Sequence, residues 1–519
     1  MDSNTLQILI AMVIYMAAVI GIGLVYAKRA NKNSEAYFLG GRSLGPWVTA
    51  MSAEASDMSG WLLMGLPGVA YWFGLADAFW TALGLAVGTY LNWLFVSKRL
   101  RRYSVRANNS ITLPEFFSNR FRENKKTIML LSAAFILIFF TAYASSCFVT
   151  CGKLFSALFG TDYVSMMILG AVFVLAYTLL GGFLAESASD FMQAIVMIVA
   201  LTVIVTLGTV NAGGFGQVIA NAKEIPGFLE FFGLATPTLD AAGTQIVENG
   251  KPLFGAASDY GWLTVCSMMA WGLGYFGMPQ VLLRFMAIRK EDELKRSRRI
   301  AMVWVGISLA VAVFIGIVGR QVFPTAHLTK SAAENIFITM ATSYLPPIIA
   351  GFVMAGILAA TISSSDSYLL IAASAFAKNI FQGICKKNAT EKQVMWVSRL
   401  TLLVLALIGV VLALDEKSII FEIVSFAWAG FGATFGPLML FSLFWKRVNK
   451  PGAIAGMVSG AAMVFLWKLV ISKLGGVFAI YELLPAFILS SLCIVVVSLL
   501  TKAPSQEIQE DFEAVKAGK

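Results

Sequence analysis

The residues best able to do chemistry lie inside segments that are otherwise apolar. The stretch 49–68 carries two carboxylates, Glu54 and Asp57, among hydroxyl side chains and glycines. A charged side chain at the centre of a bilayer costs about 3 kcal/mol, so such a group normally faces a cavity, a partner or an ion. We expect this of Asp57, because apolar sequence runs on both sides of it. The alternative is that both carboxylates lie near a membrane face and contact only solvent.

A second apolar segment, 271–279, is interrupted by three glycines and a proline. Glycine and proline weaken the helical hydrogen-bond ladder and free backbone groups. The resulting half-helix ends offer N–H groups to an anion and C=O groups to a cation. Two interrupted segments are typical of transporters built from inverted repeats, although two glycine-rich packing faces would give the same pattern.

A third segment places several oxygen atoms on one helix face. Ala360, Ser363 and Ser364 are spaced i, i+3 and i+4, so one carbonyl and two hydroxyl groups lie together. A hard monovalent cation can be held by neutral oxygen ligands of this kind. The alternative is that the serines only bond back to carbonyls of their own helix.

These segments must be positioned by helices that cross a membrane. Of the 519 residues, 58% are hydrophobic and 13% are charged, and the mean hydropathy is +0.78. Such a composition cannot build a water-soluble surface, whereas about 20 apolar residues in a helix span a bilayer. We predict an all-α polytopic membrane protein with about 13 transmembrane helices. The expected spans are 6–26, 47–69, 79–96, 127–158, 164–180, 191–210, 262–286, 302–319, 348–376, 394–414, 423–445, 453–471 and 483–500.

Lysine and arginine residues predict the orientation of the chain. They are concentrated in alternate connections, such as 98–126 and 289–299, whereas the opposite connections contain few. Positive residues are enriched in cytoplasmic loops, so we expect the amino terminus outside and the carboxyl terminus, with the tail 505–519, in the cytoplasm. The net charge of +10 does not predict a nucleic-acid partner, because the basic residues form no isolated face.

Cysteine and histidine usage argues against an enzyme. The five cysteines are scattered and suit neither a disulfide framework nor a metal motif; we interpret Cys147 and Cys151, on one helix face, as packing residues and not a metal pair. His327 is the only histidine, which argues against imidazole catalysis and against a zinc site. With no nucleophile–base pair in view, we expect no enzymatic activity.

Several sequence runs resemble a known family over nearly the whole chain. The runs GGRSLGP at 40–46, SAEASDMSGWLLMGLPG at 52–68, WGLGYFG at 271–277, RFMA at 284–287 and AWAGFG at 427–432 closely resemble the sodium/proline symporters of the sodium/solute symporter family. The resemblance implies one transmembrane domain, 1–504, with a leucine-transporter-like core of two inverted five-helix repeats at about 47–210 and 262–445. It also implies sodium-coupled symport of L-proline into the cell by alternating access, across a bacterial plasma membrane.

Site residues are carried over from the same resemblance. The sodium ligands would be the carbonyls of Ala55, Met58 and Ala360 and the hydroxyls of Ser363 and Ser364, with Asp57 supporting the ion electrostatically without binding it directly. The proline site would lie beside the sodium ion. Its expected residues are Ser59, Gly60, Trp61, Tyr143, Trp271 and Tyr275. Without the resemblance, the aromatic residues could equally be core packing or an interface belt.

Other charged positions match the family in a less specific way. Arg42 and Asp190 are expected in or near cytoplasmic connections, acting at the inner gate or in sodium release, with a solvated surface charge as the alternative. Asp366 could tune the sodium site, line the exit or form an ion pair. Glu54, where a small residue is expected, could alter cation preference or point into the outer vestibule. Met278, where a polar residue is common, puts the substrate pocket in question.

Two rival functions follow from the same residues. The substrate could be another small solute, such as betaine, pantothenate or a monocarboxylate. The chain could also be a membrane sensor that binds proline without moving it, although its sequence contains no appended signalling domain.

Overall fold

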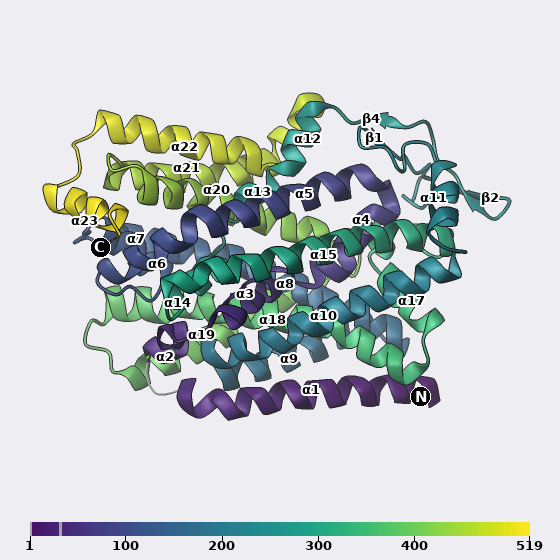
Figure 1. The fold of residues 1–519 in the computed structure, drawn as a ribbon, viewed down its shortest axis with the longest axis horizontal. Coiled ribbons are helices and arrows are strands. Elements are labelled where there is room, and N and C mark those ends of the chain that lie inside the picture. Colours follow the sequence, from purple (N-terminus) through teal and green to yellow (C-terminus); the bar gives the residue numbers. More distant parts are fainter. Residues whose placement is uncertain (1–2, 31–33, 519) are drawn as a thin grey trace.

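Long helices lying side by side make up most of the molecule (Figure 1). The computed structural model describes residues 3–30 and 34–518. The first eleven helices are α1 Ser3–Ala30, α2 Ser34–Leu39, α3 Pro46–Asp57, α4 Leu66–Phe73, α5 Leu75–Leu91, α6 Ser97–Arg106, α7 Leu113–Arg120, α8 Thr127–Phe159, α9 Tyr163–Gly181, α10 Phe183–Asn211 and α11 Phe215–Lys223. The remaining ones are α12 Trp262–Met269, α13 Trp271–Gly274, α14 Pro279–Ala287, α15 Leu294–Val322, α16 Lys330–Ala333, α17 Ile336–Tyr344, α18 Pro347–Ser374, α19 Glu391–Leu412, α20 Ile420–Phe444, α21 Lys450–Leu469, α22 Leu483–Leu500 and α23 Gln506–Lys516.

Short irregular helices join or extend several of these elements. Three are π-helical, namely η2 Trp61–Gly65, η3 Asn92–Val96 and η5 Ala375–Cys385. Four are 3-10 turns, namely η1 Gly40–Arg42, η4 Glu291–Glu293, η6 Ile471–Leu474 and η7 Gly476–Phe478. Two small antiparallel sheets follow α11; in one, β1 Gly233–Leu234 pairs with β4 Ser258–Asp259, and in the other, β2 Val247–Glu248 pairs with β3 Lys251–Pro252.

The polytopic all-α architecture is confirmed. Within residues 3–30 and 34–518, ten helices are long and apolar enough to cross a membrane, judged by length and composition. Shorter apolar helices occupy Trp61–Phe73, Tyr163–Leu179 and Trp262–Gly274. Two of these three belong to interrupted segments, which is why they fall below the length of a full span. The number of 13 crossings therefore stays a prediction, as do the repeat boundaries 47–210 and 262–445.

The helices that carry the polar segments lie at the centre of the bundle. α18 and α20 are buried over most of their length, whereas α1, α21 and α22 expose most of theirs. Figure 1 shows α1 along one edge and α21 with α22 along the opposite edge, with α3, α8, α10 and α18 between them. Polar groups in these central helices are thus shielded from lipid by other helices.

The two chain ends lie at opposite ends of the bundle. The amino terminus shares its end with α11 and the β2 hairpin, and the carboxyl terminus lies with α6, α7 and α23 (Figure 1). Residues of the expected tail form α23, which is docked by ion pairs: Arg122 Nη1 lies 2.6 Å from a Glu507 oxygen, and Arg106 Nε lies 2.8 Å from an Asp511 oxygen. The tail is therefore part of the folded structure.

One helix begins earlier than the sequence analysis predicted. The expected span 191–210 corresponds to α10, which starts at Phe183, directly after Gly182 in a left-handed conformation (φ 77°). The first two turns are polar, so hydropathy alone placed the start too late. Asp190 therefore lies inside the helix, fully buried, and not in a connection.

Glycines allow α5 to approach the interrupted segment at α13 very closely. A Cβ atom at Gly88 would overlap the backbone of Gly272, and one at Gly84 would overlap the backbone of Met269. Small residues spaced four apart let membrane helices pack with their backbones in contact. This contact fixes the position of α13 relative to α5.

We predict that Gly88→Ala destabilises the protein by about 1–3 kcal/mol, because the added methyl group overpacks a backbone contact. Gly306→Ala in α15 is the matched control, since a Cβ atom there meets nothing within 4 Å. The control should be neutral or stabilising by up to about 1 kcal/mol, as expected for glycine to alanine in a helix. Thermal unfolding of the detergent-purified variants measures both. Equal melting temperatures for the two variants would contradict the close contact.

Candidate functional site

The first interrupted segment breaks directly after Asp57. α3 ends there, Met58 and Ser59 leave the helical path, and the chain re-enters through η2 into α4. The N–H of Ser59, which would bond to Ala55 in a continuous helix, donates instead to the Asp57 carbonyl at 3.1 Å. The predicted break is therefore present, and it leaves the Ala55 carbonyl free for another partner.

The freed carbonyl meets the serine face of α18. The hydroxyl of Ser363 lies 2.8 Å from the Ala55 oxygen and 3.2 Å from the Ala360 oxygen, and that of Ser364 lies 3.4 Å from the Ala55 oxygen. Four of the five expected sodium ligands thus lie together. They are neutral oxygens, which fits a small hard monovalent cation. Met58 caps α3 at the break, and its part as a fifth ligand stays a prediction.

The Asp57 carboxylate is directed toward the second interrupted segment. Its two oxygens accept hydrogen bonds from the Tyr275 hydroxyl at 2.7 Å and from Gln280 Nε2 at 3.3 Å. The side chain is 3% exposed, so the alternative of simple solvent contact is wrong. Asp57 therefore connects the two breaks. The oxygens that meet at the serine face are all uncharged.

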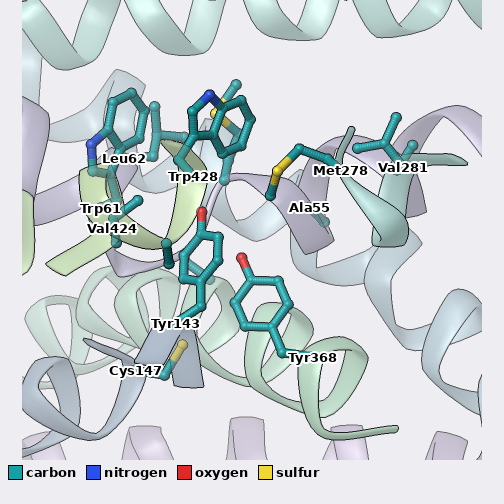
Figure 2. Packing of buried hydrophobic residues seen from close by; sticks show 14 of the residues in the cluster. Ala55, Trp61, Leu62, Tyr143, Cys147, Met278, Val281, Tyr368, Val424 and Trp428 are labelled. Atoms are coloured by element: carbon teal, nitrogen blue, oxygen red, sulfur yellow. The ribbon is translucent and has the colours of Figure 1, made fainter. Parts of the chain in front are cut away.

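The second break separates α13 from α14. Met278 has extended backbone angles (φ −76°, ψ 109°) and is followed by Pro279 at the start of α14. Position 274, close to this break, requires glycine, because a Cβ atom there would overlap the indole of Trp428. Met278 is fully buried, and in Figure 2 it lies beside Ala55 at the first break. An apolar side chain therefore occupies the position where a polar one is common.

Aromatic rings surround the region between the two breaks. The ring centroids of Trp61 and Trp271 lie 5.7 Å apart, and Tyr275 meets Trp428 edge-on at 5.0 Å. Trp428 Nε1 also donates to the Trp271 carbonyl at 2.7 Å. The expected aromatic residues are thus brought together, and Trp428 is an additional wall that the site prediction omitted. The sequence feature that could have identified Trp428 is the run AWAGFG, in which it is the only aromatic residue with a hydrogen-bond donor.

A pair of tyrosines from α8 and α18 stands on another side of this region. The centroids of Tyr143 and Tyr368 lie 4.2 Å apart, and Figure 2 shows their hydroxyl groups directed the same way, toward Trp428 and Met278. The Tyr143 hydroxyl also lies 3.4 Å from the Asp57 carbonyl. Tyr143 therefore lies where the sequence analysis expected it, and Tyr368 is a second residue that it missed.

The polar residues expected beside the aromatic ones lie at the first break. Ser59 is 1% exposed, and its hydroxyl accepts from the Trp61 N–H at 3.3 Å. A Cβ atom at Gly60 would overlap the Thr150 side chain, so this position requires glycine. We call the packed group formed by Ser59, Trp61, Trp271, Tyr275, Trp428 and the Tyr143–Tyr368 pair the aromatic chamber.

One end of the aromatic chamber is covered by the start of α20. Phe421 stacks on Trp61 at 6.2 Å and contacts Trp271 at 5.2 Å. Its position is held by Glu334, whose oxygens accept the N–H groups of Ile420 and Phe421 at 3.0 Å each. Glu334 is paired in turn with Lys153 of α8 at 2.7 Å, and both side chains are nearly inaccessible. The carboxylate thus meets a cation and the positive end of a helix at once.

Toward the opposite end, a buried network of charges surrounds Asp190. Ser52 of α3 donates to its carboxylate at 2.7 Å, and Arg284 of α14 lies 3.3 Å from it. Arg284 is fully buried and also pairs with Glu186 of α10 and with the Ser367 hydroxyl of α18. The network connects four helices. Sequence reasoning missed Glu186 and Arg284, although Arg284 opens one of the runs that carried the resemblance.

Asp366 lies next to this network without an ion pair to Arg284 among the described contacts. Its Oδ1 accepts the Ser367 N–H at 2.8 Å, and its Oδ2 is buried without a hydrogen-bond partner. The expectation of a packing ion pair is therefore not supported. Its role in tuning or releasing the ion stays a prediction.

Arg42 bonds several elements together outside the bundle core. Its guanidinium donates to the Met286 carbonyl at 2.6 Å, to Ser104 Oγ at 3.1 Å, to Asn109 Oδ1 at 3.0 Å and to the Ser110 carbonyl at 2.8 Å. Its backbone is left-handed (φ 52°), an uncommon conformation for a non-glycine residue. Burial lowers the pKa of Arg42 to about 10. Arg42 is thus a partly buried connector between α14 and the α6–α7 connection, with its guanidinium held by four hydrogen bonds.

Comparison with known proteins agrees with this geometry. The Sodium:solute symporter family matches residues 37–460. The chain is similar to the high-affinity proline transporter PutP of Bacillus subtilis (strain 168), with 41% identity covering 94% of this chain and 97% of that protein. It is also similar to the sodium/proline symporter of Escherichia coli (strain K12), with 40% identity covering 98% and 96%.

Solved structures with the same fold are more distant in sequence. A Na+-coupled sialic acid symporter in a substrate-bound outward-open state matches with a TM-score of 0.75 and 19% identity, covering 96% of this chain and 99% of that one. MhsT in complex with L-phenylalanine matches with a TM-score of 0.53 and 15% identity, covering 87% and 97%. These matches confirm the expected fold class. On the match over residues 37–460 and the identity to both relatives, the chain belongs to the sodium:solute symporter family.

Proposed function

We propose that this protein is a sodium-coupled symporter that carries L-proline into a bacterial cell by alternating access. The observation that carries the proposal is the contact between the Ala55 carbonyl and Ser363 at 2.8 Å, directly beside the aromatic chamber. Two relatives that are about 40% identical over nearly their whole length are named for proline transport, which supports proline as the solute. The proposed location is the plasma membrane.

The aromatic chamber suits a small zwitterion with an apolar ring. Backbone N–H groups at the first break, around Gly60, can donate to the proline carboxylate, and carbonyl or hydroxyl oxygens can accept from its ammonium group. The indoles of Trp61 and Trp271 provide apolar cover for the pyrrolidine ring. We therefore assign Ser59, Gly60, Trp61, Tyr143, Trp271 and Tyr275 to proline binding, with Trp428 as an added wall.

The proposed cycle begins with sodium binding from the outside. The ion is held by the oxygens of Ala55, Met58, Ala360, Ser363 and Ser364, which fixes α18 against the first break. That contact stabilises the binding-competent shape of the break, so sodium raises proline affinity by a coupling free energy. The bundle then closes at the α20 end and opens at the Arg284 end. Asp190 and Asp366 accept the ion on its way out, and Arg42 controls the inner opening.

The orientation follows from the distribution of charge between the two ends. The end that carries α6, α7 and α23 is rich in arginine and lysine, which supports our proposal that this end lies in the cytoplasm together with the carboxyl terminus. The end that carries α11 and the amino terminus then faces outside. The Phe421 cover is accordingly the outer closure of the aromatic chamber.

Uptake into proteoliposomes tests the proposal directly. An inward sodium gradient should drive accumulation of labelled L-proline above its external concentration, and collapse of the gradient should release it. Unlabelled betaine, pantothenate and acetate should compete poorly, which separates proline from the rival solutes. Binding without accumulation in tight vesicles would instead support a sensor, and accumulation of a rival solute would reassign the substrate.

Replacement of the hydroxyl ligands tests the sodium site. Ser363→Ala or Ser364→Ala should raise the sodium concentration for half-maximal uptake about ten- to a hundredfold, because a hydrogen-bonding partner of a charged group contributes about 1.5–3 kcal/mol. Ser365→Ala is the matched control, since the Ser365 hydroxyl bonds to the Thr361 carbonyl of its own helix at 2.6 Å. Uptake rates across a sodium series give the constants. If both ligand variants kept the sodium dependence of the wild type, the proposed sodium site would be rejected.

The outer closure can be tested through Glu334. In Glu334→Gln, one of the two acceptor oxygens becomes an NH2 donor that faces an α20 N–H group. Lys153 also loses its counter-charge, and such a change at a buried pair costs about 3–5 kcal/mol. The outward-open form should gain population, so Cys147, buried beside Tyr143, should react at least about tenfold faster with an impermeant maleimide.

This labelling experiment uses a background in which the other four cysteines are alanine. Glu422→Gln is its control, because Glu422 pairs with Lys330 where both side chains are partly exposed, and exposed pairs contribute about 0–1 kcal/mol. Unchanged Cys147 labelling in Glu334→Gln would show that the ion pair does not hold the closure.

A further inference from the structure

A groove runs along the side of the bundle where α3, α10 and α15 pack against one another. Its volume is about 450 Å³, and its walls include Met51 of α3, Ile195 and Val199 of α10, and Val303 and Ile307 of α15. Val199 and Val303 are 54% and 64% exposed. Because α10 and α15 are long and apolar enough to cross a membrane, their exposed apolar residues face lipid and not water. We call this feature the α3–α10–α15 groove.

One end of the groove carries a free positive charge. Arg299 forms part of the wall there, and its exposed side chain makes no hydrogen bond or ion pair among the described residues. Trp47 lines the same end and is 49% exposed, and the Arg296 guanidinium lies 6.0 Å from the centre of its ring. Tryptophan and arginine side chains of this kind are typical of the boundary between lipid tails and headgroups. The basic end of the groove therefore lies at the membrane surface.

The length of the groove corresponds to one leaflet of a bilayer. Arg299 and Ile307 are eight residues apart in α15, and such a helical segment rises about 12 Å. One leaflet contributes about 15 Å to a hydrocarbon core that is about 30 Å thick. The groove thus begins at the headgroups and continues through most of one leaflet, which is the shape that a single phospholipid requires.

The nearby carboxylates are engaged elsewhere, so they do not neutralise Arg296 and Arg299. Glu54 of α3 accepts from Trp93 Nε1 at 3.1 Å and is 2% exposed, so it also does not point into an open outer vestibule, which was one of its expected positions. The other carboxylates form the ion pairs Glu186 and Asp190 with Arg284, Glu293 with Arg289, Glu291 with Arg102, and Asp292 with Lys98.

Two other apolar grooves show that this charge is not a general feature of the lipid-facing surface. One lies between α8 and α19, and the other lies between α5 and α15. The residues that line these two grooves include no charged side chain among those described. The α3–α10–α15 groove therefore differs from them in its ability to distinguish one headgroup from another.

We propose that the α3–α10–α15 groove binds an anionic phospholipid, with its phosphate at Arg299 and Arg296 and one acyl chain between α10 and α15. Guanidinium groups pair with phosphate through two parallel hydrogen bonds. Basic pockets between membrane helices also attract anionic headgroups, and each cation near the surface contributes to the attraction.

Met51 connects the bound lipid to the first break. It lies one turn before Ala55 in α3, and the next residue, Ser52, bonds to Asp190 at 2.7 Å and to Arg284 Nε at 3.0 Å. A lipid that fills the groove packs α3 against α10 and α15 and so favours closure of the Arg284 end. This consequence rests on the proposed transport cycle, whereas binding of the lipid does not.

Native mass spectrometry of the purified protein tests the site without transport. Phosphatidylglycerol and phosphatidylcholine with identical acyl chains are the probes. The wild type should bind one phosphatidylglycerol about tenfold or more tightly than phosphatidylcholine, and Arg299→Gln should weaken phosphatidylglycerol binding about fivefold. Lys392→Gln is the control, because it removes an exposed cation at the start of α19, beside a groove without charge, and should bind as the wild type does.

A second pair of variants tests the acyl-chain position. Val303→Trp fills the groove and should abolish the tight phosphatidylglycerol site, whereas Val404→Trp fills the groove between α8 and α19 and should retain it. Equal affinity of the wild type for the two lipids, or unchanged phosphatidylglycerol binding in both Arg299→Gln and Val303→Trp, would overturn the proposal. A wild-type dimer that is lost in Val303→Trp would assign the groove to a second copy of the chain and would also overturn it.

Proteoliposomes test the connection to the first break. Replacement of phosphatidylglycerol by phosphatidylcholine should raise the sodium concentration for half-maximal uptake about fivefold in the wild type and leave Arg299→Gln unchanged. An equal shift in both proteins would reflect the charge of the whole membrane and reject the connection. If no proline accumulates although phosphatidylglycerol binds at Arg299, the lipid site stands and the proposed function fails.

Discussion

The structure depends on one carbonyl group that a continuous helix would have used. When α3 ends at Asp57, the Ala55 oxygen loses its partner inside the membrane, where no water can replace it. Ser363 and Ser364 of α18 supply the missing hydrogen bonds at 2.8 Å and 3.4 Å. The break is therefore tolerated only because α18 lies at the centre of the bundle and presents hydroxyl groups at this depth. A cation bound at this contact, as we propose, would replace those bonds, so ion binding and the shape of the break would be coupled.

The second consequence of the break concerns Asp57. Its carboxylate bonds to Tyr275 before the second break and to Gln280 after it, so one side chain holds three half-helices in register. Arg284 lies one turn beyond Gln280 and anchors the same α14 to α3, α10 and α18. A displacement of α14 must therefore disturb Asp57, and through it the first break. The two interrupted segments behave as one mechanical unit because their connections are charged and buried, and charged hydrogen bonds of this kind are costly to leave unmade.

Local composition was sufficient to predict the two breaks and the serine face. Glycine, proline and hydroxyl residues interrupt otherwise apolar runs, and the i, i+3, i+4 spacing of Ala360, Ser363 and Ser364 defines a face without any knowledge of its partner. The start of α10 was missed for the opposite reason. Glu186 and Asp190 made the first two turns look like a connection, although their charges are compensated by Arg284, which is 98 and 94 residues away in the chain. Trp428 was omitted for the same reason, since its contact with Trp271 spans 157 residues. Contacts at such separations are set by the packing of whole helices, so a local run can mark such a residue but cannot identify its partner.

The two ends of the aromatic chamber are closed by different kinds of contact, an apolar ring at one end and charged hydrogen bonds at the other. This difference is compatible with alternating access. At the α20 end the cover is Phe421, an apolar ring placed by the single Lys153–Glu334 pair and two backbone N–H groups. At the other end Arg284 is held by several oxygens from three helices, so opening that end requires many charged hydrogen bonds to be exchanged together. Opening the α20 end thus needs fewer bonds to be broken than opening the Arg284 end. The sodium ion that we propose at the first break would shift this balance, because it would replace the hydrogen bonds that join α3 to α18. A solute that binds only when both breaks are in place then adds the free energy that commits the bundle to the second opening.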